Sequence, residues 1–221
     1  MEKQERNETV VQPRSGRRLG AASGLLSVAL LTVGNDVLGG TESATGILAE
    51  LLGFAFFLFF LGSLWACLRD AEGAGGWLSA TAFGAGLAEF AVKLGSGAPL
   101  LATMADKGMD PGISRALIAI NDASFLLTFL PLAVMLSATA VVTIRWGALP
   151  RWLGWMAAVT ALGLLGGLAG GVIDPYPGWA ALPMLLYVLW IVATSVVLIR
   201  RAGEPHLVET ARPTGEPMPV R

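Results

Sequence analysis

A succession of long apolar segments limits what this chain can fold into more than any single motif does. Six stretches carry few charged side chains and match or exceed the roughly 20 residues that an α-helix needs to cross a bilayer. They cover residues 19–39, 45–68, 77–101, 115–144, 153–173 and 179–199. Lipid offers no hydrogen bonds to an open backbone, so segments of this kind fold as helices. We therefore predict an all-α fold, a polytopic transmembrane helix bundle with six spans.

The composition is typical of a membrane protein. Only 14% of the residues are charged, whereas a soluble domain averages about 25%. Residues 1–18 and 202–221 are polar and lack apolar periodicity, so we expect a disordered arm and a disordered tail around a transmembrane domain at 19–201. No basic patch indicates nucleic-acid binding, so the expected partner is the lipid bilayer, and a homo-oligomer is left open.

The fourth apolar segment is longer than a single span requires. It lies within Arg115 to Ile144, an apolar stretch of about 30 residues with Pro131 near its middle. A helix of this length must tilt, kink at the proline or begin outside the hydrocarbon.

The distribution of positive charge orients the spans. Twelve of the fifteen Lys and Arg residues lie in the two termini and in the loops after the second and fourth segments. On the other side the loops contain Lys107 and Arg115. Because cytoplasmic loops of membrane proteins are enriched in Lys and Arg, both termini are predicted to be cytoplasmic.

The third apolar segment carries a carboxylate and an ammonium, Glu89 and Lys93, on one helical face. A charge at the bilayer centre costs roughly 2.5–3.5 kcal/mol while a leucine returns about 0.3–0.6 kcal/mol, so other helices must shelter this face. In the predicted topology, further polar residues of the apolar segments fall at a similar, outer depth. The predicted polar recess comprises Asp36, Glu50, Glu89, Lys93, Asn121 and Asp122.

Two interpretations of these residues remain open. They form an outward-facing, mostly acidic recess that admits a small cation, a proton or a polar solute, or they form a structural ion-pair network near the headgroups. The first interpretation predicts a small binding or transport-like module. The second predicts a structural or regulatory membrane subunit whose polar cluster serves helix packing.

Two other patterns concern packing. The fifth segment contains glycines at G-x-x-x-G spacing, which lets a neighbouring helix approach closely, within the chain or across a dimer. These glycines are Gly163, Gly166, Gly167, Gly170 and Gly171. The phenylalanines from Phe54 to Phe60 surround the second segment, so we expect them to contact lipid.

Signatures of catalysis, cofactor binding and metal binding were sought and not found. The chain contains no H-E-x-x-H, no G-x-S-x-G, no P-loop and no dinucleotide fingerprint. Its single cysteine, Cys67, and single histidine, His206, cannot build a Cys/His metal site. We therefore assign no catalytic residue, no cofactor and no metal, and expect that the chain is not an enzyme.

Three features together resemble a known group of proteins. They are NDASFLLTFLPLAVML (Asn121 to Leu136), GALPRWLGW (Gly147 to Trp155), and a glycine-rich helix followed by an apolar helix that ends in Arg-Arg. The combination resembles bacterial, especially actinobacterial, integral-membrane proteins that carry a domain of unknown function, and the likeness covers roughly Trp77 to Arg201. This resemblance implies a compact multi-helix domain in the bacterial cytoplasmic membrane, and it transfers no catalytic residue.

Overall fold

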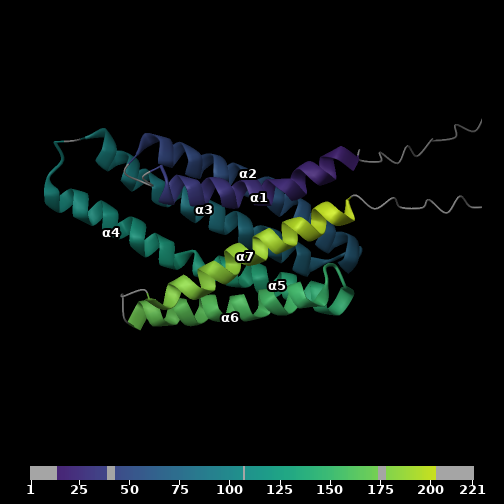
Figure 1. Ribbon diagram of the computed structural model, residues 1–221. Coiled ribbons are helices and arrows are strands. Elements are labelled where there is room, and N and C mark those ends of the chain that lie inside the picture. The colour runs from purple at the N-terminus through teal and green to yellow at the C-terminus, as the bar shows by residue number, and fades with distance from the viewer. Residues whose placement is uncertain (1–13, 39–42, 107, 174–177, 203–221) are drawn as a thin grey trace, which may run out of the picture.

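The computed structural model describes residues 14–38, 43–106, 108–173 and 178–202 (Figure 1). All regular secondary structure within these ranges is α-helical, so the prediction of an all-α fold is confirmed for them. The helices are α1 (Arg14–Asp36), α2 (Ala44–Glu72), α3 (Trp77–Ala105), α4 (Pro111–Leu127), α5 (Phe129–Trp146), α6 (Arg151–Ile173) and α7 (Gly178–Arg201).

Four stretches of the described helices are long and apolar enough to cross a membrane. They are Ala44–Glu72, Pro111–Trp146, Arg151–Ile173 and Ala181–Arg201. Such lengths and compositions indicate a membrane protein. Helices α1 and α3 are not among the four, because small and polar residues interrupt their apolar runs.

Several helices extend beyond the predicted apolar segments. Helix α1 begins at Arg14, inside the arm that was expected to be disordered, and α3 continues to Ala105. At 1.5 Å per residue the 29 residues of α2 span about 44 Å, more than the roughly 30 Å of bilayer hydrocarbon. Sequence hydropathy therefore predicted only the apolar part of each helix. Backbone hydrogen bonds continue the helix into the polar residues on either side.

The connection between α2 and α3 is short and capped by one side chain. Gly73, with φ of +88°, follows the last residue of α2 in a region that favours glycine. The Glu72 carboxylate accepts hydrogen bonds from the backbone N–H groups of Leu78 at 3.1 Å and Ser79 at 2.8 Å. It thereby satisfies two of the N–H groups that the first turn of α3 leaves without intrahelical partners.

The long fourth segment breaks at Thr128. Pro131 has no N–H group and its ring crowds the carbonyl four residues earlier, so the helix cannot continue regularly through this turn. The Thr128 N–H is shared between the carbonyls of Ser124 at 3.3 Å and Phe125 at 3.2 Å. Of the three predicted alternatives the structure contains the kink, about one turn before the proline, and α4 and α5 are its two arms.

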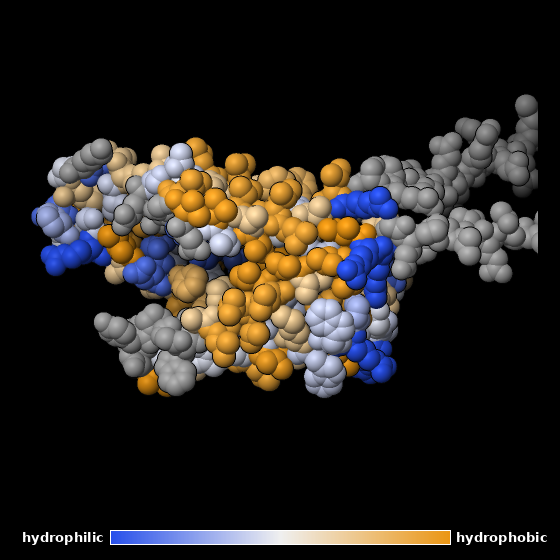
Figure 2. Space-filling model, in the orientation of Figure 1, coloured by the Kyte–Doolittle hydropathy of each residue, from blue (hydrophilic) through white to orange (hydrophobic). Residues whose placement is uncertain are grey.

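The helices form one bundle in which α5 to α7 lie against α1 to α3. Helix α1 packs between α2 and α7, α3 packs against α5, and α6 packs between α5 and α7. The start of α1 and the end of α7 lie at the same end of the bundle, on the right in Figure 1. Hydrophilic residues gather at that end, next to the orange apolar belt in Figure 2.

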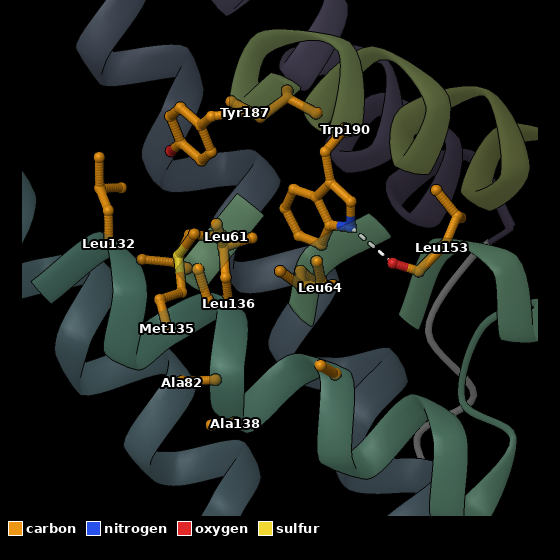
Figure 3. Close-up of a cluster of buried hydrophobic side chains, with 14 of the residues drawn as sticks. Leu61, Leu64, Ala82, Leu132, Met135, Leu136, Ala138, Leu153, Tyr187 and Trp190 are labelled. Carbon is orange, nitrogen blue, oxygen red and sulfur yellow. Dashed lines mark hydrogen bonds between the residues drawn. The ribbon is translucent and has the colours of Figure 1, made fainter. Parts of the chain in front are cut away.

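The core lies between α2, α5, α6 and α7. Phe60, Leu64 and Leu136 are fully buried there, and so is Trp190 of α7. The Trp190 ring meets Phe60 edge to face, with 6.4 Å between ring centroids. Its indole Nε1–H donates a hydrogen bond of 3.2 Å to the carbonyl of Leu153 in α6 (Figure 3). One polar atom of the apolar core is thus satisfied across two helices.

Helix α1 approaches its neighbours through glycines. A Cβ at Gly24 would overlap the Ser195 hydroxyl of α7 and lie 2.7 Å from Cδ2 of Phe60 in α2. A Cβ at Gly20 would overlap the Ser63 side chain of α2. The sequence contains this G-x-x-x-G spacing too, and the close approach it permits joins α1 to both neighbours.

The expectation that the phenylalanines of α2 contact lipid needs correction. Phe54, Phe57 and Phe60 are buried, at 8%, 3% and 0% exposure, and do not face lipid. Phe59 does project outward, with 65% of its surface exposed. The spacing of the three buried rings places them on one helical face. Because every face of this helix is apolar, the sequence does not show which face is buried.

Candidate binding cavity

A cavity of about 830 Å³ lies between α1, α2, α3, α4 and α6. It is at the end of the bundle opposite the start of α1 and the end of α7, where Figure 2 shows hydrophilic residues in a hollow of the surface. At the break at Thr128, α4 departs from the direction of α5 and packs mainly against α3, and the cavity lies between α4 and the helices that it faces. Helix α4 contains no buried residue, so it covers the cavity without entering the core.

Most of the cavity wall is apolar. Helix α2 supplies Phe54, α3 supplies Leu94 and Leu100, and α4 supplies Phe125 and Leu126. Phe54 is held edge to face against Phe90 of α3, with 6.4 Å between ring centroids. An apolar wall with a few polar groups is the usual composition of a site for small organic molecules.

Lys93 is the basic residue of the cavity lining. It lies on the inward face of α3, on which Gly86, Glu89 and Ser96 are buried. Its Nζ lies 4.4 Å from the centroid of the Phe125 ring in α4, a cation–π contact. The Ser96 hydroxyl donates a 2.8 Å hydrogen bond to the Lys93 carbonyl one turn along the same helix.

Two carboxylates attract Lys93 from different helices. Glu50 of α2, which lines the cavity, and Glu89 of α3 both act on the ammonium by Coulombic attraction. Within the described residues, however, no carboxylate oxygen comes within the 4.0 Å of Nζ that defines an ion pair. The ammonium therefore lies over the Phe125 ring and is attracted by two carboxyl groups that it does not contact.

Glu89 lies one helical turn deeper than Lys93. Only 6% of its surface is exposed, and no cavity-lining atom belongs to it. No described residue hydrogen-bonds its carboxyl group, which interacts electrostatically with Lys93 of the same helix and with the buried Tyr187 of α7. Glu89 thus lies beneath the polar part of the cavity without lining it.

Helix α4 contributes the other polar groups. Asn121 is half-buried and Asp122 is exposed, and both line the cavity. Four of the six residues predicted to form a polar recess therefore share one cavity wall, and Glu89 lies beneath it. Asp36 ends α1, but its side chain lies outside the described part of the structure.

Sequence reasoning missed most of the residues that line the cavity. Asn35, Phe54, Ser96 and Phe125 belong to the wall although they were not predicted as site residues. Asn35 precedes Asp36 in an apolar segment, and Ser96 follows Lys93 by three residues, so polarity within a span could have marked both. No signal separates Phe54 and Phe125 from the other phenylalanines, because their place depends on how α2, α3 and α4 meet.

The predicted glycine face of α6 has mixed surroundings. A Cβ at Gly163 would lie 3.2 Å from Pro183 of α7, and one at Gly171 would lie 2.7 Å from Leu126 of α4. Gly166 faces open space. Gly167 is buried and Gly170 is half-buried. Close packing within the chain therefore occurs at Gly163 and Gly171, and Gly171 also belongs to the cavity wall.

The part of the chain that the structure describes contains no cluster of side chains suited to bind a metal ion. Nowhere in these residues do three His, Cys, Asp or Glu side chains come together as ligands would. Comparisons of the chain with protein-family models, curated proteins and solved structures give no match.

Proposed function

We propose that this chain is a six-span protein of the bacterial cytoplasmic membrane that binds a small, positively charged solute in the cavity, from the outer face. In this arrangement α1 and α3 are two further spans beside the four candidate stretches, and α4 and α5 together form one span. The lengths of α1 and α3, 23 and 29 residues, suffice to cross the hydrocarbon. Ser23 and Ser27 of α1 and Glu89 of α3 are buried in the bundle, which keeps these polar groups away from lipid.

The orientation rests on charge. Arg69, Arg145 and Arg151 lie in or beside the loops at the end of the bundle where α1 begins and α7 ends. The positive-inside rule assigns that end to the cytoplasm, and the cavity, at the other end, then opens outward. Resemblance of the sequence to bacterial integral-membrane proteins supports the cytoplasmic membrane as the location.

The observation that carries the proposed activity is an excess of carboxylates around a cavity that already contains a cation. Glu50 and Asp122 line the wall against the ammonium of Lys93, and the Glu89 carboxyl lies below it. Two wall carboxylates against one ammonium leave negative charge at the site, which a second cation compensates. We therefore favour a binding or transport-like module.

Binding and flux in proteoliposomes test this proposal. The purified chain should bind or pass at least one cation from a panel of Na⁺, K⁺, methylammonium and larger ammonium ions. A Glu50→Gln/Asp122→Asn variant should lose this activity, whereas Asp106→Asn, which changes an exposed carboxylate outside the wall, should keep it. If no member of the panel binds or moves more than in protein-free vesicles, the proposal is wrong.

A structural or regulatory subunit is the second candidate, and the contact of Lys93 with Phe125 favours it, since that contact joins α3 to α4. If the polar cluster only holds helices together, a Glu89→Gln/Lys93→Met protein should be more stable than Lys93→Met alone, because no buried charge is left without its partner. It should also bind no cation in any form. Thermal unfolding in detergent, measured beside binding, separates the two candidates.

A further inference from the structure

The size of the cavity favours an organic molecule over a bare inorganic ion as its natural occupant. At about 830 Å³ the cavity lies within the range typical of sites for organic ligands. A monatomic cation would use the few polar groups and leave the apolar wall without a partner. The apolar side chains of the wall, among them Phe54, Leu100 and Leu126, fit a molecule with an apolar body.

The position for the charged part of such a molecule is marked by Lys93 itself. Its ammonium lies over the Phe125 ring and is attracted by Glu50, so a carboxylate and an aromatic face already surround a cation at this point. Aromatic faces bind alkylated ammonium groups well, because these groups are weakly hydrated. Glu89, one turn deeper on α3, offers Lys93 a second carboxylate to approach.

Resting on the proposed function, we propose that the ligand is an organic ammonium with an apolar body, and that Lys93 occupies the ligand's cation position between Glu50 and Phe125 until the ligand displaces it toward Glu89. Lys93 is then an internal competitor. The apolar body lies along the wall formed by α2, α3 and α4. The ligand and Lys93 cannot occupy this position together. When the ligand is bound, its ammonium compensates Glu50 and Lys93 compensates Glu89.

This inference predicts an increase in affinity when a charged residue is removed. The probe is phenyltrimethylammonium, titrated calorimetrically into the full chain in nanodiscs. Lys93→Met should bind it about tenfold more tightly than the parent, because the competing ammonium is gone, while Glu50→Gln should bind about tenfold more weakly. Phe125→Leu should weaken binding about three- to tenfold through loss of the aromatic face. Arg115→Met, which removes an exposed cation outside the wall, should leave affinity unchanged.

Two further probes separate this inference from the proposed function. Benzenesulfonate has an aromatic body with the opposite charge and should not bind, and K⁺ should not compete with phenyltrimethylammonium. Binding of K⁺ or Na⁺ without binding of phenyltrimethylammonium would overturn the inference and leave the proposed function standing. Absence of binding by every cation would overturn both.

The variants keep the inference testable if one of them folds poorly. Lys93→Met that binds phenyltrimethylammonium no more tightly than the parent contradicts internal competition. If Lys93→Met gives no folded protein, Lys93→Gln is measured in its place, with the same expected gain. Unchanged affinity in both Glu50→Gln and Phe125→Leu would show that the ammonium does not bind between these residues, and would also overturn the inference.

Discussion

At the scale of single residues, Trp190 shows how one polar atom can be accommodated in the apolar core. The side chain is fully buried, and its Nε1–H reaches the Leu153 carbonyl at 3.2 Å. Trp190→Phe removes this hydrogen bond and leaves part of the indole volume empty. We expect a loss of about 1–3 kcal/mol in the free energy of unfolding, seen as a lower thermal midpoint in detergent.

Trp155 provides the matched control for this substitution. It lies on α6 with 62% of its surface exposed, so Trp155→Phe should change the midpoint little. Equal losses in the two variants would contradict a specific role for the buried indole.

Residue polarity within apolar segments predicted much of the polar part of the candidate cavity. Glu50, Lys93, Asn121 and Asp122 were found in this way, because the cost of exposing such groups to lipid turns them toward other protein groups. The apolar wall could not be predicted by the same reasoning. Phe54 and Phe59 differ in burial, at 8% and 65%, although both are phenylalanines of one all-apolar helix, so nothing in residue type distinguishes them.

At the scale of helices, small residues decide how closely two helices approach. A Cβ at Gly24 would overlap Ser195 of α7, whereas a Cβ at Gly62 of α2 would meet no atom within 4 Å. Gly24→Ala should therefore lower the free energy of unfolding by about 1–3 kcal/mol, because α1 must shift. Gly62→Ala should leave stability unchanged or raise it by up to about 1 kcal/mol through helix propensity.

Thermal unfolding of both variants in one detergent tests this pair. The two substitutions add the same methyl group to helix interiors, so propensity alone predicts equal effects. A Gly24→Ala protein as stable as Gly62→Ala would show that α1 does not pack closely on α7.

Helix existence was predictable, whereas helix ends and the break in the long segment were only partly so. Apolar length predicted six segments, and Pro131 indicated a possible kink. The break lies at Thr128, before the proline is reached, where the backbone N–H is shared between the carbonyls of Ser124 and Phe125. The long segment could tilt, kink or begin outside the hydrocarbon. The outcome depends on how α5 packs against α3 and α6, which the sequence of this one segment does not show.

At the scale of the whole molecule, the predicted topology assigns each end of the bundle to one side of the membrane. In a Cys67→Ala background, a cysteine at Ala74 should react with an impermeant maleimide only after the cells are opened. A cysteine at Asp106 should react in intact cells. A reporter fused after Arg201 should be active in the cytoplasm, since Lys and Arg are concentrated at that end.

The opposite labelling pattern would reverse the orientation, and labelling of both cysteines in intact cells would contradict the six-span arrangement. Both positions are suited to this test, because Ala74 and Asp106 are exposed.

Because helix α4 contains no buried residue, we expect it to move on a shorter timescale than the rest of the protein. Detaching a helix costs free energy in proportion to the packing that is lost, so α4 should open locally while the core around Trp190 stays intact. Its amide hydrogens should then exchange with solvent deuterons much faster than those of α5, although both helices belong to one apolar segment. Equal protection of α4 and α5 would mean that the two open together. If α4 exchanges first, the wall that carries Asn121 and Asp122 is the part of the cavity that fluctuates, and the shape offered to a solute changes on that timescale.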